Sequence, residues 1–204
     1  VWPVVVLDSL GRTYTLDAAE IPGGRGDGVP VGSLVELQNG AEVAAMISGL
    51  PEQHYLLSNS GGYGFIAKLA DMVGRVKAGK VMISLEAGEK VLPPQAVFTV
   101  SLINPDCKVV LASSANRLLA FALGELKVMA KGRGLQLMNL GEDEKLAHIA
   151  VVSTPEFVVE SVGKRGAVRC ERLRIQDIEN KRGRKGRLLE ISGRLKAIGG
   201  TDAE

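Results

Sequence analysis

Four short segments of the sequence combine glycine with lysine or arginine, residue types suited to holding phosphate. They read PGGRGDG, VGRVKAGK, KVMAKGRG and ENKRGRKG, and begin at residues 22, 73, 127 and 179. Glycine lets a backbone come close to a bulky anion, and neighbouring cations neutralise phosphate charge. The cations of these loops are therefore the candidate residues for binding a polyanion.

The candidates share a place in or directly beside a glycine turn. In the last three loops they are Arg75, Lys77, Lys80, Lys131, Arg133, Lys181, Arg182, Arg184, Lys185 and Arg187. Lys164 and Arg165 form a second-rank pair, because they stand at the tip of a predicted hairpin that could face either way. The first loop offers only Arg25, which Asp27 offsets.

The charge of the chain is unevenly distributed. The formal net charge is +2, yet residues 1–100 carry 7 Lys/Arg and 10 Asp/Glu, whereas residues 101–204 carry 18 and 13. Residues 161–196 alone hold 12 basic and 4 acidic residues, a net +8. A solubilising face is the plain interpretation of such a cluster, but its position on glycine-rich loops favours a polyanion partner near the C-terminal end.

The loop Gly74–Lys80 matches the GxxxxGK start of a nucleotide-binding phosphate loop. However, Val81 stands where Ser or Thr would bind Mg²⁺, and an extended run follows where a helix should begin. We therefore do not expect a nucleotide site. His54 and His148 fall in strand patterns and are interpreted as packed side chains. With no GxSxG, HExxH or paired-carboxylate motif, the sequence predicts no catalytic residue, cofactor or metal site in this segment.

The loops recur because the chain is built from repeats of about fifty residues. Each repeat opens with two extended runs joined by a tight turn, which is typical of a β-hairpin. An acidic and an apolar residue follow, and the apolar members Ile21, Met72, Leu126 and Ile178 are 51, 54 and 52 residues apart. The glycine loop comes next, and two further extended runs close the repeat. A short helix fits almost as well at residues 41–46 and 123–129.

The predicted strands come in eight pairs. The hairpins are Val4–Asp8 with Arg12–Leu16, His54–Ser58 with Tyr63–Ala67, Val109–Ser113 with Arg117–Phe121, and Phe157–Ser161 with Ala167–Leu173. The closing pairs are Ser33–Leu37 with Val43–Ile47, Lys80–Leu85 with Lys90–Val97, Leu135–Leu140 with Leu146–Val152, and Arg187–Ile191 with Leu195–Ile198.

Four strands in about 51 residues indicate a propeller-like blade, and 204 residues accommodate four such units, approximately 1–50, 51–105, 106–155 and 156–204. One blade cannot bury both of its faces, so neighbours must stack. We therefore predict a single all-β domain, and equivalent loops on one rim.

The composition of the chain indicates which class of nucleic acid it binds and which cellular compartment it occupies. Only 8 of the 204 residues are aromatic, and none interrupts the four loops. Proteins that bind single-stranded nucleic acid use aromatic side chains on which the bases stack, so the sequence favours duplex DNA held by its phosphates. A duplex that follows the rim would be bent. No run of 18 apolar residues is present, so no membrane span is expected. Two cysteines, 63 residues apart, form no disulfide framework and fit a reducing cytoplasm.

Several stretches of the chain resemble a known family. They are VVVLDSLGRTYTLDAAEIPGGRGDG (4–28), SNSGGYGFIAKLADMVGRVKAGK (58–80), the following Leu92-Pro93-Pro94, and VGKRGAVRCERLRIQDIENKRGRKG (162–186). The chain is similar to the C-terminal domains of the bacterial gyrase A and topoisomerase IV A family. The QRRGGKG-type box of gyrase is missing, which points to topoisomerase IV and away from strong chiral wrapping of DNA.

The resemblance implies a β-pinwheel, whose blades exchange strands in a ring that can be open or broken. It implies a fragment of a longer chain that binds and bends duplex DNA without sequence specificity, and so steers supercoil relaxation and decatenation by the parent enzyme. That parent is an ATP-dependent type IIA topoisomerase, with ATP and Mg²⁺ on other domains or subunits and the catalytic Tyr outside this chain. The implied partners are the B subunit of topoisomerase IV, in an A2B2 assembly, and a chromosome-organising SMC-type protein at the nucleoid. The alternative is a propeller-like protein-interaction scaffold that does not bend DNA.

Overall fold

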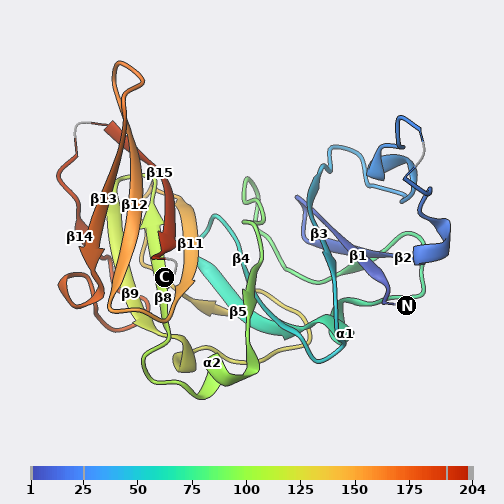
Figure 1. The fold of residues 1–204 in the computed structure, drawn as a ribbon, viewed down its shortest axis with the longest axis horizontal. Helices are drawn as coiled ribbons and strands as arrows, with labels where there is room; N and C mark the ends of the chain where they lie inside the picture. Colours follow the sequence, from blue (N-terminus) through green and yellow to red (C-terminus); the bar gives the residue numbers. More distant parts are fainter. Residues whose placement is uncertain (1, 25, 192, 202–204) are drawn as a thin grey trace.

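The computed structural model describes residues 2–24, 26–191 and 193–201, and shows four antiparallel sheets that follow one another along the chain (Figure 1). The first sheet, at the N-terminal end, and the fourth, at the C-terminal end, lie at opposite ends of an arc. The prediction of an all-β chain with blade-like repeats is confirmed, and the arrangement is open rather than a closed ring.

Three sheets have four strands and the last has three. In spatial order, the first sheet holds β3 (Val43–Ser48), β1 (Val4–Asp8), β2 (Arg12–Leu16) and β6 (Lys80–Val81). The second holds β10 (Leu135–Gln136), β5 (Tyr63–Lys68), β4 (His54–Ser58) and β7 (Gln95–Val97). The third holds β11 (Leu146–Val152), β8 (Lys108–Ser113), β9 (Arg117–Ala122) and β14 (Arg187–Leu188). The fourth holds β13 (Val168–Arg174), β12 (Glu156–Gly163) and β15 (Gly193–Gly200).

Helical segments are short and lie in the connections. Two are α-helical, α1 (Leu69–Met72) and α2 (Thr99–Ile103), and four are 3₁₀ turns at Ala18–Glu20, Val31–Ser33, Leu123–Glu125 and Ile175–Asp177. The helical alternative is therefore correct only for the first part of residues 123–129, while residues 43–46 lie in strand β3. None of the helices in the part of the chain that the structure describes is long and apolar enough to cross a membrane.

Each of the first three sheets takes its outer strand from the next repeat. The exchanged strand β6 pairs with β2, β10 pairs with β5, and β14 pairs with β9, all antiparallel. Strand β13 is the equivalent receiving strand of the fourth sheet, and no described strand pairs with its outer edge. Neighbouring blades are thus joined by backbone hydrogen bonds as well as by side-chain packing.

Burial on both faces of the middle sheets stacks the blades. Along β4, Leu56 packs in a core between the second and third sheets, whereas the next residue, Leu57, packs in a core between the first and second. In β8, Val109 faces the second sheet and Val110 faces the fourth. Successive side chains of a strand point to opposite faces, so a continuous apolar run is what a doubly covered strand requires.

The segment Ser33–Leu37, predicted as a strand, is not one. It begins in a 3₁₀ turn at Val31–Ser33, and Leu34 and Leu37 pack onto Val6 on the outer face of the first sheet. Pro30 directly precedes this turn and has no N–H to donate to a ladder. This segment therefore covers the exposed end of the stack instead of entering another sheet.

The exchanged strands are also shorter than predicted, two residues each. After Val81 the chain leaves the ladder, because the N–H groups of Met82 and Ile83 both donate to the carbonyl of Gly11. Leu137 and Met138 make the same pair of bonds to Gly62. Similarly, Lys90–Val97 is a strand only from Gln95, since Pro93 and Pro94 precede it.

A glycine with positive φ starts each exchanged strand. Gly79, Gly134 and Gly186 have φ of 67°, 84° and 79°, and each lies against the backbone of its receiving strand. A Cβ at Gly134 would overlap the carbonyl oxygen of Gly64. Gly28 occupies the same place in the first repeat with a φ of 73°, but nothing lies within 4 Å of a Cβ there.

This pair of glycines gives a direct test of the strand exchange. We expect Gly134→Ala to lower the free energy of unfolding by about 2–5 kcal/mol, because left-handed strain adds to a backbone clash. Gly28→Ala carries only the strain and should cost about 1–2 kcal/mol. Chemical denaturation measures both, and equal losses would contradict the close approach at Gly134.

A second test concerns the first hairpin, where the buried Tyr14 hydroxyl donates to Asp8 Oδ2 at 2.9 Å. Burial, and then the hydrogen bond to Asp8, raise the pKa of Tyr14 above its usual value. Tyrosine ionises near pH 10 in an unfolded chain, so the stabilisation is complete below that pH and is lost as pH rises through the folded pKa. At pH 7 the free energy of unfolding should be about 1 kcal/mol higher for wild type than for Tyr14→Phe. This difference should become smaller above pH 10. A gap independent of pH would contradict this assignment.

Candidate nucleic-acid interface

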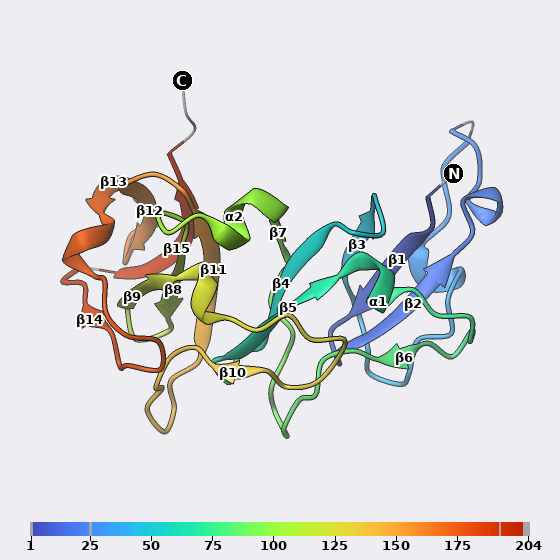
Figure 2. The ribbon, with the colours of Figure 1, turned by 90° about the horizontal axis from the view of Figure 1, so that it is seen from below.

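The glycine loops lie in a connected row along one rim of the arc. We call residues 73–79, 127–134 and 179–186 the second, third and fourth exchange loops, because each leads into a strand of the preceding sheet. In Figure 2 their exchanged strands β6, β10 and β14 follow one another along the length of the molecule. The predicted alignment of these three loops is therefore what the topology produces.

Backbone hydrogen bonds tie the third and fourth loops to the exchanged segment that precedes each of them. Gly132 of the third loop donates to Met82 O and accepts from Ser84 N, both at 3.0 Å. Gly183 of the fourth loop donates to Leu137 O at 2.9 Å, and Arg184 O accepts from Asn139 N at 3.1 Å. The row is thus a continuous backbone structure, which fixes the spacing between successive groups of cations.

Most of the predicted cations project into solvent. The exposed members are Arg75, Lys77, Lys131, Lys164, Arg165, Lys181, Arg184, Lys185 and Arg187. None of these nine forms an ion pair with another described residue. Their charges remain available to an anionic ligand.

Three predicted cations are only partly exposed, and each makes contacts within the protein. Lys80 Nζ donates to Val73 O at 2.7 Å, which closes the second loop. Arg182 Nη1 donates to Gln136 O at 2.5 Å, so the fourth loop is held against the exchanged strand β10. Arg133 lies between Glu86 and Glu89. Local pattern gives no sign of this division, since exposed cations and partly buried ones stand in or beside the same loops.

The first loop differs from the other three. Arg25, its only cation, lies outside the described residues, and Asp17, Glu20 and Glu36 line a hollow of about 890 Å³ that also includes Arg75 and Lys77. The first loop is therefore weakly charged, whereas the fourth loop is strongly cationic.

The hairpin tip of the fourth repeat is built differently from the first three. Ser9, Ser60 and Ser114 each bind a later segment of their own repeat through backbone and hydroxyl groups. Lys164 occupies this position in the fourth repeat, and both it and Arg165 are exposed at the end of a protruding hairpin (Figure 1).

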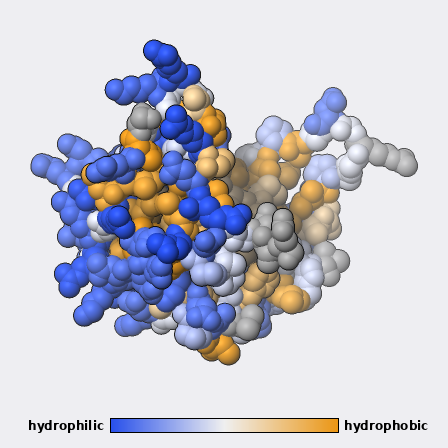
Figure 3. Space-filling view, turned by 60° about the vertical axis from the view of Figure 1, so that its left-hand side comes forward, coloured by the Kyte–Doolittle hydropathy of each residue, from blue (hydrophilic) through white to orange (hydrophobic). Residues whose placement is uncertain are grey.

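Arg169 is a cation that the sequence-based prediction missed. It lines a groove of about 600 Å³ together with Lys164 and Arg165, and none of the described residues that line this groove carries a carboxylate. Its position in the second strand of the predicted hairpin, close to the tip, could have identified it as a candidate. In Figure 3 hydrophilic side chains cover most of this end of the molecule and surround an apolar area. Leu188 and Val168 are each about half exposed.

Arg12 is a second residue that the prediction overlooked. Its guanidinium donates to Ala78 O at 3.0 Å and to Gly79 O at 2.9 Å, across the boundary between the first and second repeats. Those carbonyls belong to the second exchange loop, so Arg12 supports the backbone that carries Arg75 and Lys77.

The loop that matches the start of a phosphate-binding motif leads into strand β6, as expected, rather than into a helix. His54 is buried in β4, and His148 Nε2 lies 3.3 Å from Leu195 O. Among the residues that the structure describes, no group of three His, Cys, Asp or Glu side chains could hold a metal ion.

Comparisons with known proteins agree with this architecture. Residues 108–153 match the family model "DNA gyrase C-terminal domain, beta-propeller". The chain is 66% identical over 188 residues to the A subunit of DNA topoisomerase 4 from Neisseria gonorrhoeae, covering 92% of this chain and 24% of that protein. It is 34% identical over 195 residues to the Haemophilus influenzae protein of the same name, covering 91% of this chain and 25% of the relative.

A solved structure covers most of the fold. The C-terminal domain of Escherichia coli ParC superposes with a TM-score of 0.84 at 30% identity, over 97% of this chain and 80% of that one. The chain spans about a quarter of the length of the curated relatives that it matches. Its exchanged strands, its four repeats and these matches together show that it belongs to the family of C-terminal domains found in the A subunit of DNA topoisomerase IV.

Proposed function

We propose that this domain binds and bends duplex DNA without reading its sequence, as part of a type II topoisomerase. The observation that carries the proposal is the row of exposed cations on exchange loops along one rim, where the third and fourth loops are each hydrogen-bonded to the exchanged segment before them. Cations spaced along a rigid arc suit a phosphate backbone that follows the same curve.

Duplex DNA is preferred over single strands because the exchange loops contain no aromatic side chain on which a base could stack. Contacts to phosphate alone carry no sequence information, so binding should depend on salt and on the ease of bending. The twelve predicted cations remain candidates, with the nine exposed ones placed best for direct contact.

The proposal extends to the parent enzyme. We expect it to require ATP and Mg²⁺ on other domains or subunits, to use a catalytic Tyr outside this chain, and to assemble with the B subunit as A2B2. In the cytoplasm, at the nucleoid, this domain would select which DNA crossings reach the cleavage site. An SMC-type chromosome-organising protein stays a predicted partner, and the basic fourth repeat is the surface whose charge suits an acidic protein face.

A protein-interaction scaffold is the second candidate. Its support is α2 with its flanking residue, because Phe98 is 67% and Ile103 84% exposed. A scaffold predicts weak salt dependence and no bending of DNA, so DNA binding itself separates the two functions.

The salt dependence of DNA binding tests the interface. For wild type, log K should fall linearly with log salt, with a slope of about −0.9 for each phosphate neutralised. Replacing Lys181, Arg184 and Lys185 with Ala should make the slope less negative by up to about 3, equally for unrelated sequences. Fluorescence anisotropy with short duplexes measures both quantities.

A matched control uses three other exposed cations of the same repeat. Arg172 and Arg174 lie on β13 and Lys196 lies on β15, outside the exchange loop, and their triple Ala variant changes the net charge by the same amount. The assignment to the loop predicts a smaller change of slope for this variant. Equal slopes for the two triple variants would show that net charge, and not the loop, sets the binding.

The role in the parent enzyme is tested by removing this domain. The truncated enzyme should still cleave DNA, because the catalytic Tyr lies elsewhere, but should lose its preference between supercoiled and catenated substrates. Topology-resolved relaxation and decatenation assays measure this preference. A truncated enzyme that retains it would contradict the proposed steering role.

A further inference from the structure

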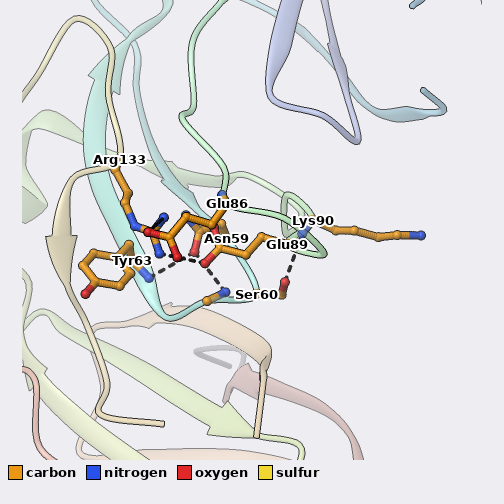
Figure 4. Close-up of polar contacts among 8 residues, drawn as sticks. Asn59, Ser60, Tyr63, Glu86, Glu89, Lys90 and Arg133 are labelled. Atoms are coloured by element: carbon orange, nitrogen blue, oxygen red, sulfur yellow. Dashed lines mark hydrogen bonds and ion pairs between the residues drawn. The ribbon is translucent and has the colours of Figure 1, made fainter. Parts of the chain in front are cut away.

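Arg133 differs from the other cations of the rim because two carboxylates hold it. Its Nη1 lies 2.8 Å from Glu86 Oε1, and its Nη2 lies 2.7 Å from Glu89 Oε1. The guanidinium carbon is 4.2 Å from the centre of the Tyr63 ring, so the planar group is also held by a cation–π contact (Figure 4). The side chain is only 24% exposed, and that of Glu89 only 12%.

These contacts join three segments that are distant in the sequence. Arg133 belongs to the third exchange loop, and Tyr63 begins strand β5 of the second sheet. Glu86 and Glu89 lie in residues 84–90, the connection that leads the chain from β6 in the first sheet back toward β7 in the second.

The connection 84–90 is already held at both ends by backbone hydrogen bonds. Ser84 N donates to Gly132 O at 3.0 Å, and Lys90 O accepts from Ser60 N at 2.8 Å. Glu89 closes the turn between them by accepting from Glu86 N at 2.9 Å. The pairs with Arg133 fix the middle of this connection, which joins the first sheet to the second.

No cation of the other two exchange loops forms an ion pair with a described residue. The residue directly before the exchanged glycine is Arg133 in the third loop, but Ala78 in the second and Lys185 in the fourth. Lys185 is exposed and forms no ion pair with the residues that the structure describes. Arg133 and Lys185 are therefore matched in position and differ in surroundings.

The same surroundings make Arg133 a poor contact for phosphate. Two carboxylates already neutralise its charge, so Arg133 attracts an approaching phosphate less than an unpaired cation does. A guanidinium that already binds two carboxylates and an aromatic ring must also lose those contacts before it can bind DNA.

We propose that Arg133 is a positioning residue that fixes the angle between the first and second blades, and so sets the curvature of the rim. It acts through Glu86, Glu89 and Tyr63 rather than by touching DNA. The effect on curvature rests on the proposed function, whereas the fastening of residues 84–90 is a property of the free protein.

The test compares Arg133→Lys, Glu89→Gln and Lys185→Ala with wild type. Arg133→Lys keeps the charge but loses the planar fork, and Glu89→Gln keeps the shape but loses the charge. In the free protein, both should speed amide exchange at Ser84 and Gly132 by about tenfold, corresponding to about 1.4 kcal/mol of local opening. Lys185→Ala should leave these amides unchanged. Circular dichroism confirms that each variant is folded.

The same variants are then measured with duplex DNA. End-to-end energy transfer on a labelled duplex should report less bending with Arg133→Lys and Glu89→Gln, while the salt slope stays that of wild type for Arg133→Lys. Lys185→Ala should instead make the slope less negative by about 0.9 and leave the bend of the bound duplex unchanged.

Three results would overturn the proposal or part of it. Unchanged amide exchange in both Arg133→Lys and Glu89→Gln would eliminate the fastening itself. Normal bending with Arg133→Lys, together with tighter binding by Glu89→Gln, would show that Arg133 is a phosphate contact. If wild type neither binds nor bends DNA, the proposed function fails, and the exchange measurement still decides whether Arg133 fastens the two blades.

Discussion

The hydrogen-bonded pairing of each sheet with a strand from the next repeat is the constraint on which this structure depends. It makes every blade incomplete without its neighbour, so the blades cannot rotate freely about their connections. A two-residue ladder is short, but two further backbone hydrogen bonds follow it, from Met82 and Ile83 to Gly11 in the first sheet and from Leu137 and Met138 to Gly62 in the second. The apolar residues that follow then enter the core between blades. Pairing and burial therefore reinforce each other at each junction.

The position of the cations follows from this exchange. A loop that must cross to the preceding sheet passes over the rim, and it can pass closely only where glycine replaces a side chain. The residues beside that glycine face solvent, where lysine and arginine cost little. Because each loop must cross to the preceding sheet in the same way, a group of cations recurs along one edge of the molecule. The loops then differ in how many of their cations are free, with most free charge on the fourth loop and a fastened arginine on the third.

The two ends of the stack are treated differently. At the first sheet, residues 31–37 fold back over Val6 and Tyr14 and close the apolar outer face. At the fourth sheet, β13 keeps an unpaired outer edge within the described residues, and its side chains are mostly exposed and charged. Charged side chains on an edge strand discourage pairing with other chains. The outer face of the first sheet and the outer edge of the fourth are thus both compatible with an open arc. No core cluster of the described residues joins the first sheet to the fourth.

The repeat, the hairpins and the glycine loops were predictable from local pattern, because the same constraints act in each unit. Strand β11 and most hairpin strands lie where apolar runs and turn residues place them. The exchanged strands were predicted too long, since the double hydrogen bond that ends the ladder involves a carbonyl about seventy residues away. Pro30 argues against a strand at residues 33–37. The sequence does not show, however, that this segment covers the outer face of the first sheet.

An all-β chain of four repeats, with cations concentrated on glycine loops, can be inferred from the residues alone, and so can the family resemblance. These properties are local or compositional, and they recur in each repeat. Which of the cations are free depends instead on contacts that form when the chain folds. Arg133 and Lys185 hold the same place in their repeats, yet carboxylates from a connection more than forty residues earlier surround the first, while the second stays exposed. The sequence gives the charge of a side chain. Whether that charge is free to bind an anionic ligand depends on the neighbours that folding brings next to it.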